Sequence, residues 1–427
     1  MKKLLRSITA LWLAFLARLV IAKYKPRIVM VTGSVGKTST KDAVRAALSS
    51  RAFVRASEKS YNSEFGVPLT ILGSKNPWTD ALGWFRVLKE ACALLLLPNH
   101  YPTILVLEVG ADRPGDLAKI LRIATPDVVV VTWLPEIPVH VEAYISPEAV
   151  REEEFVPAYG LAQGAPLIIA SEDHHARTYA KRLAANVSSF GFDKEATVRI
   201  EHPRVFMEGD MVSGMEATLS TNEGTYDIKV QGALGRPQLL APAAALASAL
   251  ALEIPIEEAL TGLATYAPPP GRMRIFKGKE DALLIDDSYN ASPAAVEEAL
   301  STLSLVEAKR RIVILGDMLE LGRYSVSEHE RIARLAASSA DVFVTVGIRA
   351  RAMAEVARKA GLRDDAVISF DSSKNATQPL VSLVRKGDVV LIKGSQSIRM
   401  ERIVEALLAD PLDVVNLVRQ DKEWRRR

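Results

Sequence analysis

Short, continuous apolar runs alternate along the chain with longer segments of helical period. The runs lie at 28–31, 103–109, 127–132, 166–170 and 188–192, and then at 282–286, 311–315, 342–346, 367–370 and 389–392. Runs of this length, rich in Val and Ile, are typical of parallel strands that are buried on both faces. Helical segments lie between them, including 41–50, 78–97, 297–303 and 329–338. The alternation predicts an α/β fold.

Two breaks in this pattern divide the chain. Between 198 and 230 apolar and polar residues alternate singly, which predicts antiparallel hairpins at the side of the first sheet. The segment Pro268-Pro269-Pro270-Gly271 is the clearest interruption, and we place a domain boundary there. The expected units are an N-terminal amphipathic helix over 1–25, a central domain over 26–268 and a C-terminal domain over 269–427.

The first apolar run leads into a candidate phosphate-binding loop, Thr-Gly-Ser-Val-Gly-Lys-Thr, at 32–38. Gly33 and Gly36 allow the backbone N–H groups of residues 34–39 to point at phosphate oxygens, and the following helix N-terminus adds positive partial charge. Lys37 can reach the β- and γ-phosphates, and the Thr38 hydroxyl can bind Mg²⁺. The full P-loop pattern requires a glycine where this chain has Val31, so the motif belongs to a compact subset; the alternative is a Gly/Ser turn beside a solvated lysine.

The loop predicts a P-loop-type central ATPase domain with a mostly parallel sheet, followed by a doubly wound, Rossmann-like C-terminal domain. Glu108 ends a predicted strand, where open α/β sheets bind ligands, and is therefore a candidate Mg²⁺ ligand or else a structural salt-bridge partner. His140 is a lone histidine, which is more often structural than metal-binding. The run Glu152–Glu154 is by default a solvated helix face.

Composition and charge bear on the partners and the compartment of the protein. The 427 residues are 48% hydrophobic and 25% charged, with a net charge of +3, which gives no reason to expect nucleic acid as a partner. One cysteine, Cys92, excludes internal disulfides and fits a reducing compartment, and an ATP site also indicates the cytoplasm.

The N-terminal segment carries a stripe of apolar residues from Leu4 to Leu19 at helical spacing, with basic residues beside it. Arg18 and Lys23 interrupt the segment too early for a comfortable membrane span. It is either a helix packed on its own domain or an anchor that lies on a membrane surface at the inner face. The leucine run 94–97 is expected to belong to the core.

Six motifs, in order and at consistent spacing, are similar to those of the Mur ligase family. They are the loop at 32–40, Asn-x-x-x-Gly-x-Pro-Leu-Thr at 62–70, Glu-Val-Gly-Ala at 108–111, the pair Asp-Asp-Ser-Tyr-Asn-Ala-Ser-Pro at 286–293 and Gly-Asp-Met-Leu-Glu-Leu-Gly at 316–322 with His329, and Lys-Gly-Ser at 393–395. The resemblance covers about 26–408 and is nearest to the MurF branch, which adds D-alanyl-D-alanine to UDP-N-acetylmuramoyl-tripeptide.

The resemblance implies an ATP-dependent ligase of cell-wall synthesis that forms an acyl phosphate, which an amino acid or dipeptide amine then attacks. It implies that Lys37 stabilises the transferred phosphoryl group, that Thr38 and Glu108 bind one Mg²⁺, and that His140 binds a second. The implied nucleotide-binding residues are Gly33, Ser34, Val35, Gly36, Lys37, Thr38, Ser39, Arg272, Asp286 and Asn290. The implied substrate-binding residues are Asn62, Ser63, Asp317, Glu320, Lys393 and Ser395.

The chain departs from the family pattern in four places. Only 1–25 precedes the loop, where the MurF branch has a uridine-nucleotide-binding domain. Glu154 aligns with a lysine that most members carbamylate; a carbamylated lysine is anionic, so a glutamate can replace it as a catalytic carboxylate, with Glu152 or Glu153 as alternatives. Pro237 and Ala241 stand where the family has His and Asn beside adenine. The loop 133–139 is longer than usual.

Two other functions stay open at this point. One is a ligase for a different carboxylate, similar to folylpolyglutamate synthetase, and the other is a non-catalytic nucleotide-binding subunit of a cell-wall complex. The retained lysine, threonine, glutamate and histidine favour catalysis. We expect the protein to be a monomer.

Overall fold

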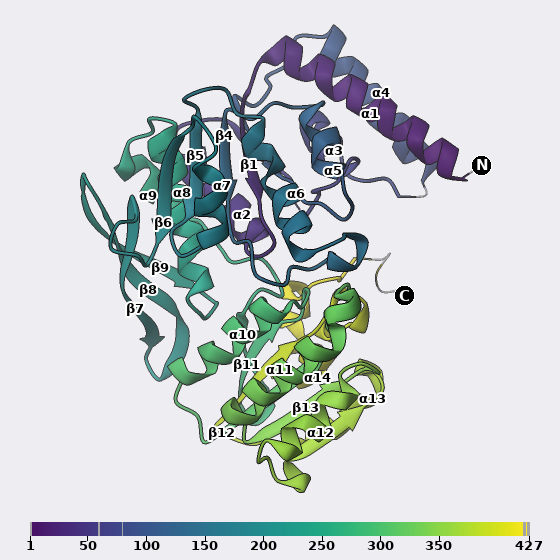
Figure 1. Ribbon diagram of the computed structural model, residues 1–427, viewed down its shortest axis with the longest axis vertical. Helices are drawn as coiled ribbons and strands as arrows, with labels where there is room; N and C mark the ends of the chain where they lie inside the picture. Colours follow the sequence, from purple (N-terminus) through teal and green to yellow (C-terminus); the bar gives the residue numbers. More distant parts are fainter. Residues whose placement is uncertain (1, 59, 79, 422–423, 425–427) are drawn as a thin grey trace.

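The computed structural model describes residues 2–58, 60–78, 80–421 and 424, with side chains described from Ser7 onward. Two sheets lie one above the other along the long axis of the molecule (Figure 1). The first has nine strands in the order β2-β3-β1-β4-β5-β6-β7-β8-β9. Their bounds are β1 Arg27–Thr32, β2 Val54–Ala56, β3 Ile104–Glu108, β4 Val128–Val131, β5 Pro166–Ala170, β6 Asn186–Gly191, β7 Val198–Glu208, β8 Met211–Thr221 and β9 Gly224–Gln231.

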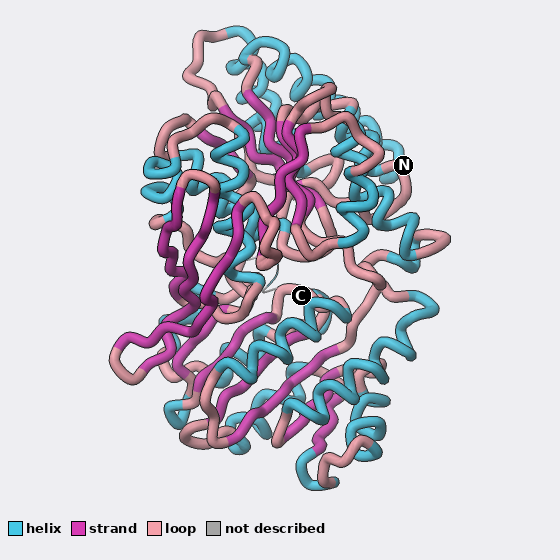
Figure 2. The backbone as a smooth tube through the Cα atoms, turned by 60° about the vertical axis from the view of Figure 1, so that its left-hand side comes forward, coloured by secondary structure: helices cyan, strands magenta, loops and turns pink. Residues whose placement is uncertain are grey.

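The strands from β2 to β7 run parallel, and β7, β8 and β9 are antiparallel. Figure 2 shows these long antiparallel strands extending down one side of the molecule. The predicted parallel strands and the predicted hairpins are therefore both confirmed. The short strand β2 was not predicted, because three half-buried residues carry too little periodicity to be recognised.

Helices cover both faces of the first sheet, because alternate residues of its strands point to opposite sides. Val29 and Val31 of β1 join a core with α2 Lys37–Ser49, α8 Pro237–Ala251 and α9 Ile256–Leu263. Ile28 and Met30 join a second core on the other face. The helices of that face are α1 Lys2–Tyr24, α3 Gly66–Leu72, α4 Ala81–Leu96, α5 Asp116–Leu121, α6 Pro147–Tyr159 and α7 His174–Ala180.

The second sheet has six strands in the order β10-β11-β15-β12-β13-β14, with only β10 antiparallel. The strands are β10 Arg274–Lys277, β11 Leu283–Asp287, β12 Arg310–Gly316, β13 Val342–Val346, β14 Val367–Phe370 and β15 Asp388–Lys393. The helices are α10 Pro293–Thr302, α11 Ser325–Ser339, α12 Arg351–Lys359, α13 Ser373–Leu383 and α14 Glu401–Leu407. The first three share a core with one face of the sheet and the last two with the other, as a doubly wound fold requires.

The leucine run 94–97 is core only in part, and the first helix packs on its domain by a face other than the apolar stripe of the sequence. On α1 the side chains that pack on the domain are Leu13, Leu16, Ala17 and Val20, whereas most of the predicted stripe, from Ile8 to Leu19, is exposed; the side chains of Leu4 and Leu5 lie outside the described residues. In the run expected to be core, Leu96 is 80% exposed and Leu97 57% exposed. Helical period identifies an apolar face but not which face meets the protein. The domain boundary at 268 stays a prediction; α9 ends at Leu263 and β10 begins at Arg274.

Candidate active site

The phosphate-binding loop connects β1 to α2 and lies at the carboxyl edge of the first sheet. Gly33 and Gly36 have φ values of +115° and +90°, in the left-handed region that favours glycine. A Cβ on Gly33 would lie 2.4 Å from Thr132 Oγ1 at the end of the neighbouring strand. Lys37 Nζ donates to the Gly33 carbonyl, so its side chain folds back over the loop. Among the described residues no side chain caps α2, so its first N–H groups face the cavity beside the loop.

Glu108 stands at the end of β3, next to β1 in the sheet. It is 2% exposed, and its Oε2 has no hydrogen-bond partner among the described residues. Asn62 Nδ2 lies 3.4 Å from Glu108 Oε1, and Thr38 Oγ1 lies 2.9 Å from Ser60 Oγ. Burial raises the pKa of Glu108, and the positive charges of Lys41, Lys37 and Arg272 oppose that rise. A buried carboxylate oxygen without a partner, beside a hydroxyl, is the donor set that Mg²⁺ prefers.

Three consecutive glutamates of α6 have three different environments. Glu154 is buried and accepts a hydrogen bond from Ser34 Oγ at 2.5 Å. Glu153 accepts from the N–H groups of Gly115 and Leu117 at the start of α5. Glu152 pairs with Arg182 at 2.9 Å on the surface. Only Glu154 therefore reaches the phosphate-binding loop.

Burial raises the pKa of Glu154, and the charge of Lys37 is the largest influence that lowers it. The default interpretation of this run as a solvated face is wrong for Glu154, because the Thr32 hydroxyl bonds its carbonyl and holds that turn of α6 against β1.

His140 connects the two halves of the molecule. It has a φ of +64°. Its Nδ1 lies 3.1 Å from Glu320 Oε2, which follows β12 in the second half, and its Nε2 lies 3.5 Å from Asp112 Oδ1. Burial raises the pKa of Glu320, and the nearby His140 lowers it. The lone histidine of the sequence is thus placed between two carboxylates at the cavity.

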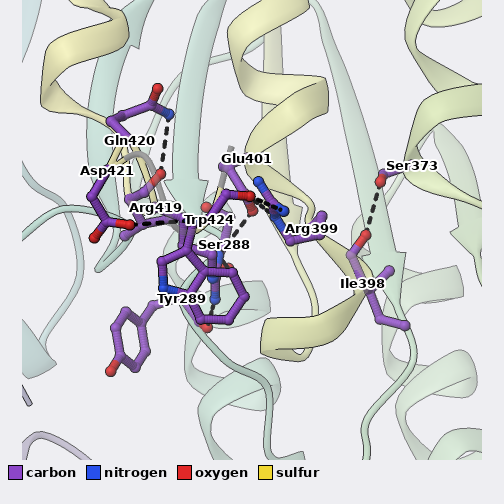
Figure 3. Close-up of polar contacts among 11 residues, drawn as sticks. Ser288, Tyr289, Ser373, Ile398, Arg399, Glu401, Arg419, Gln420, Asp421 and Trp424 are labelled. Atoms are coloured by element: carbon purple, nitrogen blue, oxygen red, sulfur yellow. Dashed lines mark hydrogen bonds and ion pairs between the residues drawn. The ribbon is translucent and has the colours of Figure 1, made fainter. Parts of the chain in front are cut away.

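The C-terminal segment closes the cavity from the second half. Figure 3 shows Arg419 and Arg399 directed at the buried carboxylate of Glu401. Arg419 also donates to the carbonyls of Ser288 and Tyr289, which lie in the loop after β11. This loop carries Asn290 into the cavity. Arg419, which no sequence motif indicated, therefore positions Asn290, which a motif did indicate.

One cavity of about 750 Å³ lies between the carboxyl edges of the two sheets. The sequence-predicted residues that line it are Ser34, Val35, Gly36, Lys37, Thr38, Asn62, Glu108, His140, Arg272, Asn290, Glu320 and Ser395. Sequence reasoning missed Ser60, Asp112 and Arg399, which also line it. Ser60 lies beside the Asn62 motif and Asp112 directly follows the motif at 108–111, which were available signals, whereas Arg399 carries none.

Of the predicted residues outside this lining, Gly33 and Glu154 belong to the loop and its contact, Ser39 lines the smaller cavity described below, and four others make different contacts. Ser63 Oγ accepts from Gly66 N at the start of α3, Asp317 Oδ1 accepts from Ala350 N, and Asp286 Oδ1 accepts from Ser288 N. Lys393 is buried, with its Nζ 2.5 Å from Asp287 Oδ2 and 3.0 Å from the Asn290 carbonyl. In this structure Lys393 supports the loop of Asn290 and lines the smaller cavity described next, not the 750 Å³ cavity.

A second cavity, of about 370 Å³, adjoins the first beyond Gly36 and Ser39. The Arg236 guanidinium lies 4.0 Å over the Phe192 ring at its wall, and Gln238 Oε1 is buried without a partner among the described residues. Pro237 lines this cavity, and Ala241 is buried in the core of α8. A cavity with several apolar lining residues and a buried amide oxygen, next to a phosphate-binding loop, has the chemistry that a purine base requires.

The fold and the site define a P-loop nucleotide-binding protein whose loop faces a second, Rossmann-like domain. The Mur ligase middle domain model matches residues 31–249, just over half of the chain, and the model of the Mur ligase glutamate ligase domain matches residues 271–396. The chain therefore belongs to the Mur ligase family of ATP-dependent ligases.

Named relatives and solved structures agree with this assignment. UDP-N-acetylmuramoyl-tripeptide–D-alanyl-D-alanine ligase of Bacillus subtilis is 28% identical over 399 residues, 93% of this chain and 79% of the relative. The crystal structure of MurF ligase from Thermotoga maritima in complex with ADP superposes with a TM-score of 0.76 at 26% identity, covering 93% of this chain and 83% of that one. Mycobacterium tuberculosis folylpolyglutamate synthase complexed with ADP shares the fold. Its TM-score is 0.65 at 16% identity, covering 92% of this chain and 94% of that one.

Proposed function

We propose that this chain is an ATP-dependent amide ligase that joins D-alanyl-D-alanine, or a similar amine, to the carboxylate of a cell-wall peptide precursor. The observation that carries the proposal is the 750 Å³ cavity, where a phosphate-binding loop with Lys37 and Thr38 faces the buried Glu108 and residues of the second domain. The MurF relatives support the choice of substrates.

The reaction follows from the charges that the cavity assembles. A carboxylate oxygen of the acceptor attacks the γ-phosphorus of ATP, and ADP leaves. The amine nitrogen then attacks the acyl carbon, loses a proton, and the C–O bond to phosphate breaks. Lys37 of the loop and Arg272, just before β10, both line the cavity and screen the negative charge of the phosphoryl group as it moves. Closure of the two domains over the cavity excludes water, which would otherwise hydrolyse the acyl phosphate.

Magnesium fits the residues beside Lys37. The Thr38 hydroxyl and the Glu108 carboxylate, with its unpartnered Oε2, would hold one ion. His140, with the carboxylates of Asp112 and Glu320 at 3.5 and 3.1 Å, would hold a second. A bound divalent ion neutralises the charge of the triphosphate oxygens.

We assign to Glu154 the part of the carbamylated lysine of other family members. Its side chain carries a carboxylate without any modification. This carboxylate is buried and accepts a hydrogen bond from Ser34 of the loop. A carbamate must form from CO₂ and a neutral amine, whereas a glutamate needs no such step. The ligase reaction of this chain should therefore proceed without bicarbonate.

The test is phosphate release from ATP by the purified chain with UDP-N-acetylmuramoyl-tripeptide, with and without D-alanyl-D-alanine. Release that requires both substrates and is abolished by Lys37→Ala, but not by Lys359→Ala on the surface of the second domain, is the expected result. ATP binding without stimulation by either substrate would contradict the substrate assignment. A screen of other carboxylates would then separate a ligase for another acceptor from a non-catalytic subunit.

A cytoplasmic location follows from the use of ATP, and we place the protein at the inner face of the membrane, where cell-wall precursors are consumed. We propose that it acts there as a monomer.

A further inference from the structure

Helices α1 and α4 lie side by side at the end of the molecule that is farthest from the second domain (Figure 1), and both leave large apolar side chains exposed. We call it the α1–α4 face. The large apolar side chains that define it are each more than half exposed: Leu11, Trp12 and Phe15 on α1, and Leu82, Phe85 and Leu96 on α4. Large exposed apolar side chains gathered on two adjacent helices mark a site of contact with another phase or molecule.

The fold holds α1 in place with this side outward. Leu13, Leu16, Ala17 and Val20 on the opposite side of the helix are buried in the core of the domain. Lys23 Nζ donates to the carbonyls of Leu94, Leu95 and Leu97 at 2.7–3.0 Å, so that the end of α1 caps the end of α4. The exposed stripe is thus a second apolar face of a helix that is already packed.

By length and composition Ser7–Tyr24 could cross a membrane, with a mean hydropathy of 1.5 and 22% of that segment buried. A span would require the four packed side chains to leave the core and the Lys23 contacts to break. Lying parallel to a surface leaves both intact, and an amphipathic helix with basic residues beside its apolar stripe is typical of that position.

Charge identifies what the face meets. Residues 1–27 contain seven lysines and arginines and no acidic residue, and because the whole chain carries +3, the remaining residues carry a net charge of −4. Arg18 on α1 and Arg86 and Lys89 on α4 are exposed among the apolar side chains. Trp12 is of the aromatic type that is enriched at the headgroup level of a bilayer, and Phe15 and Phe85 are of the type that an interfacial helix buries on its apolar face.

We propose that the α1–α4 face docks the protein on an anionic lipid bilayer, with its aromatic and leucine side chains among the headgroups and its basic side chains against the lipid phosphates. A second copy of this chain does not fit as well, because a two-fold contact would place the same positive charge on both sides. This inference rests on the proposed location at the inner face of the membrane, and it adds which surface of the protein makes the contact.

The test measures binding of the full chain to sedimented vesicles, without ATP or substrates. One set contains phosphatidylcholine with phosphatidylglycerol, and the other phosphatidylcholine alone. The variant is Leu11→Glu with Phe85→Glu. The matched control is Ile348→Glu with Leu412→Glu, which replaces two aliphatic side chains of the second domain that are about 80% exposed. All four positions are exposed, so the variants should fold as the parent chain does, which thermal melting checks.

Binding at least tenfold tighter to the anionic vesicles, weakened at least tenfold by the α1–α4 variant and by 0.5 M salt but not by the control, is the expected result. Equal binding of parent and variant would overturn the proposal. So would concentration-dependent dimerisation in sedimentation velocity that the variant abolishes, because the face would then be a protein interface. Ligase activity on soluble substrates is measured separately, so a chain that binds vesicles but has no such activity contradicts the proposed reaction and leaves the docking intact.

Discussion

Replacing Lys393 by methionine distinguishes a structural role of this lysine from the substrate-binding role that the family motif implies. The ammonium is 2% exposed and lies 2.5 Å from Asp287 Oδ2 and 3.0 Å from the Asn290 carbonyl. Methionine fills a similar volume but leaves Asp287, whose side chain is 9% exposed, without its counter-charge. The variant therefore creates an unpaired buried carboxylate at the end of β11.

Removing one partner of a buried ion pair costs about 3–5 kcal/mol in free energy of unfolding. For a domain of this size each kcal/mol lowers the Tm by about 2–4 °C, so Lys393→Met should lower the Tm of the second domain by about 6–20 °C. The double variant Lys393→Met with Asp287→Asn removes the unpaired charge and should recover at least half of that loss. The surface lysine Lys386, 78% exposed and 3.8 Å from Asp281, is the matched control, and Lys386→Met should change the free energy of unfolding by less than about 1 kcal/mol.

Calorimetry of the four proteins, with steady-state kinetics for the amine in parallel, is the assay. A Tm within 2 °C of the parent chain, together with a tenfold rise in KM for the amine, would refute this reasoning and would show that Lys393 binds substrate as the motif implies. A lowered Tm that the second substitution does not rescue would show that packing, not charge, holds the loop.

Three further outcomes follow from the site. Glu154→Gln should lower kcat about 100- to 1,000-fold, because it removes an anion from a water-excluded site, whereas depletion of bicarbonate should leave the parent enzyme unchanged; a bicarbonate requirement would contradict the glutamate substitution. Burial raises the pKa of Asp286 to about 6, so the folded state binds the Asp286 proton more tightly than the unfolded state does. The free energy of unfolding should therefore fall as pH rises from about 4 to 6. Asp286→Asn should raise the Tm at pH 7.5 but not at pH 4. Gly33→Ala should abolish binding of a fluorescent ATP analogue, whereas Gly164→Ala, also at positive φ but in open space, should not.

Much of the candidate site is local in sequence and could be predicted. The loop at 32–38 and the carboxylate at 108 follow strands that read clearly as apolar runs, so their placement at one sheet edge follows from the rule for parallel sheets. Lys393 and Asp317 were also matched by motif, but whether a side chain enters a cavity or pairs inside the fold depends on neighbours such as Asp287 and Ala350, which are distant in sequence.

The sequence by itself determined the two α/β units, the phosphate-binding loop and the family, because each depends on residues within one strand–loop–helix segment. Only the tertiary structure decided that Glu154 and not its two neighbours reaches the loop, since a helix turns each successive side chain by about 100° and the packing of α6 against β1 sets which one points inward. It alone decided that Leu13 and Leu16, rather than Leu11 and Phe15, are buried on α1. Both helices carry apolar or charged residues on more of their surface than a single neighbouring element covers. The tertiary fold determines which of these residues contact that element.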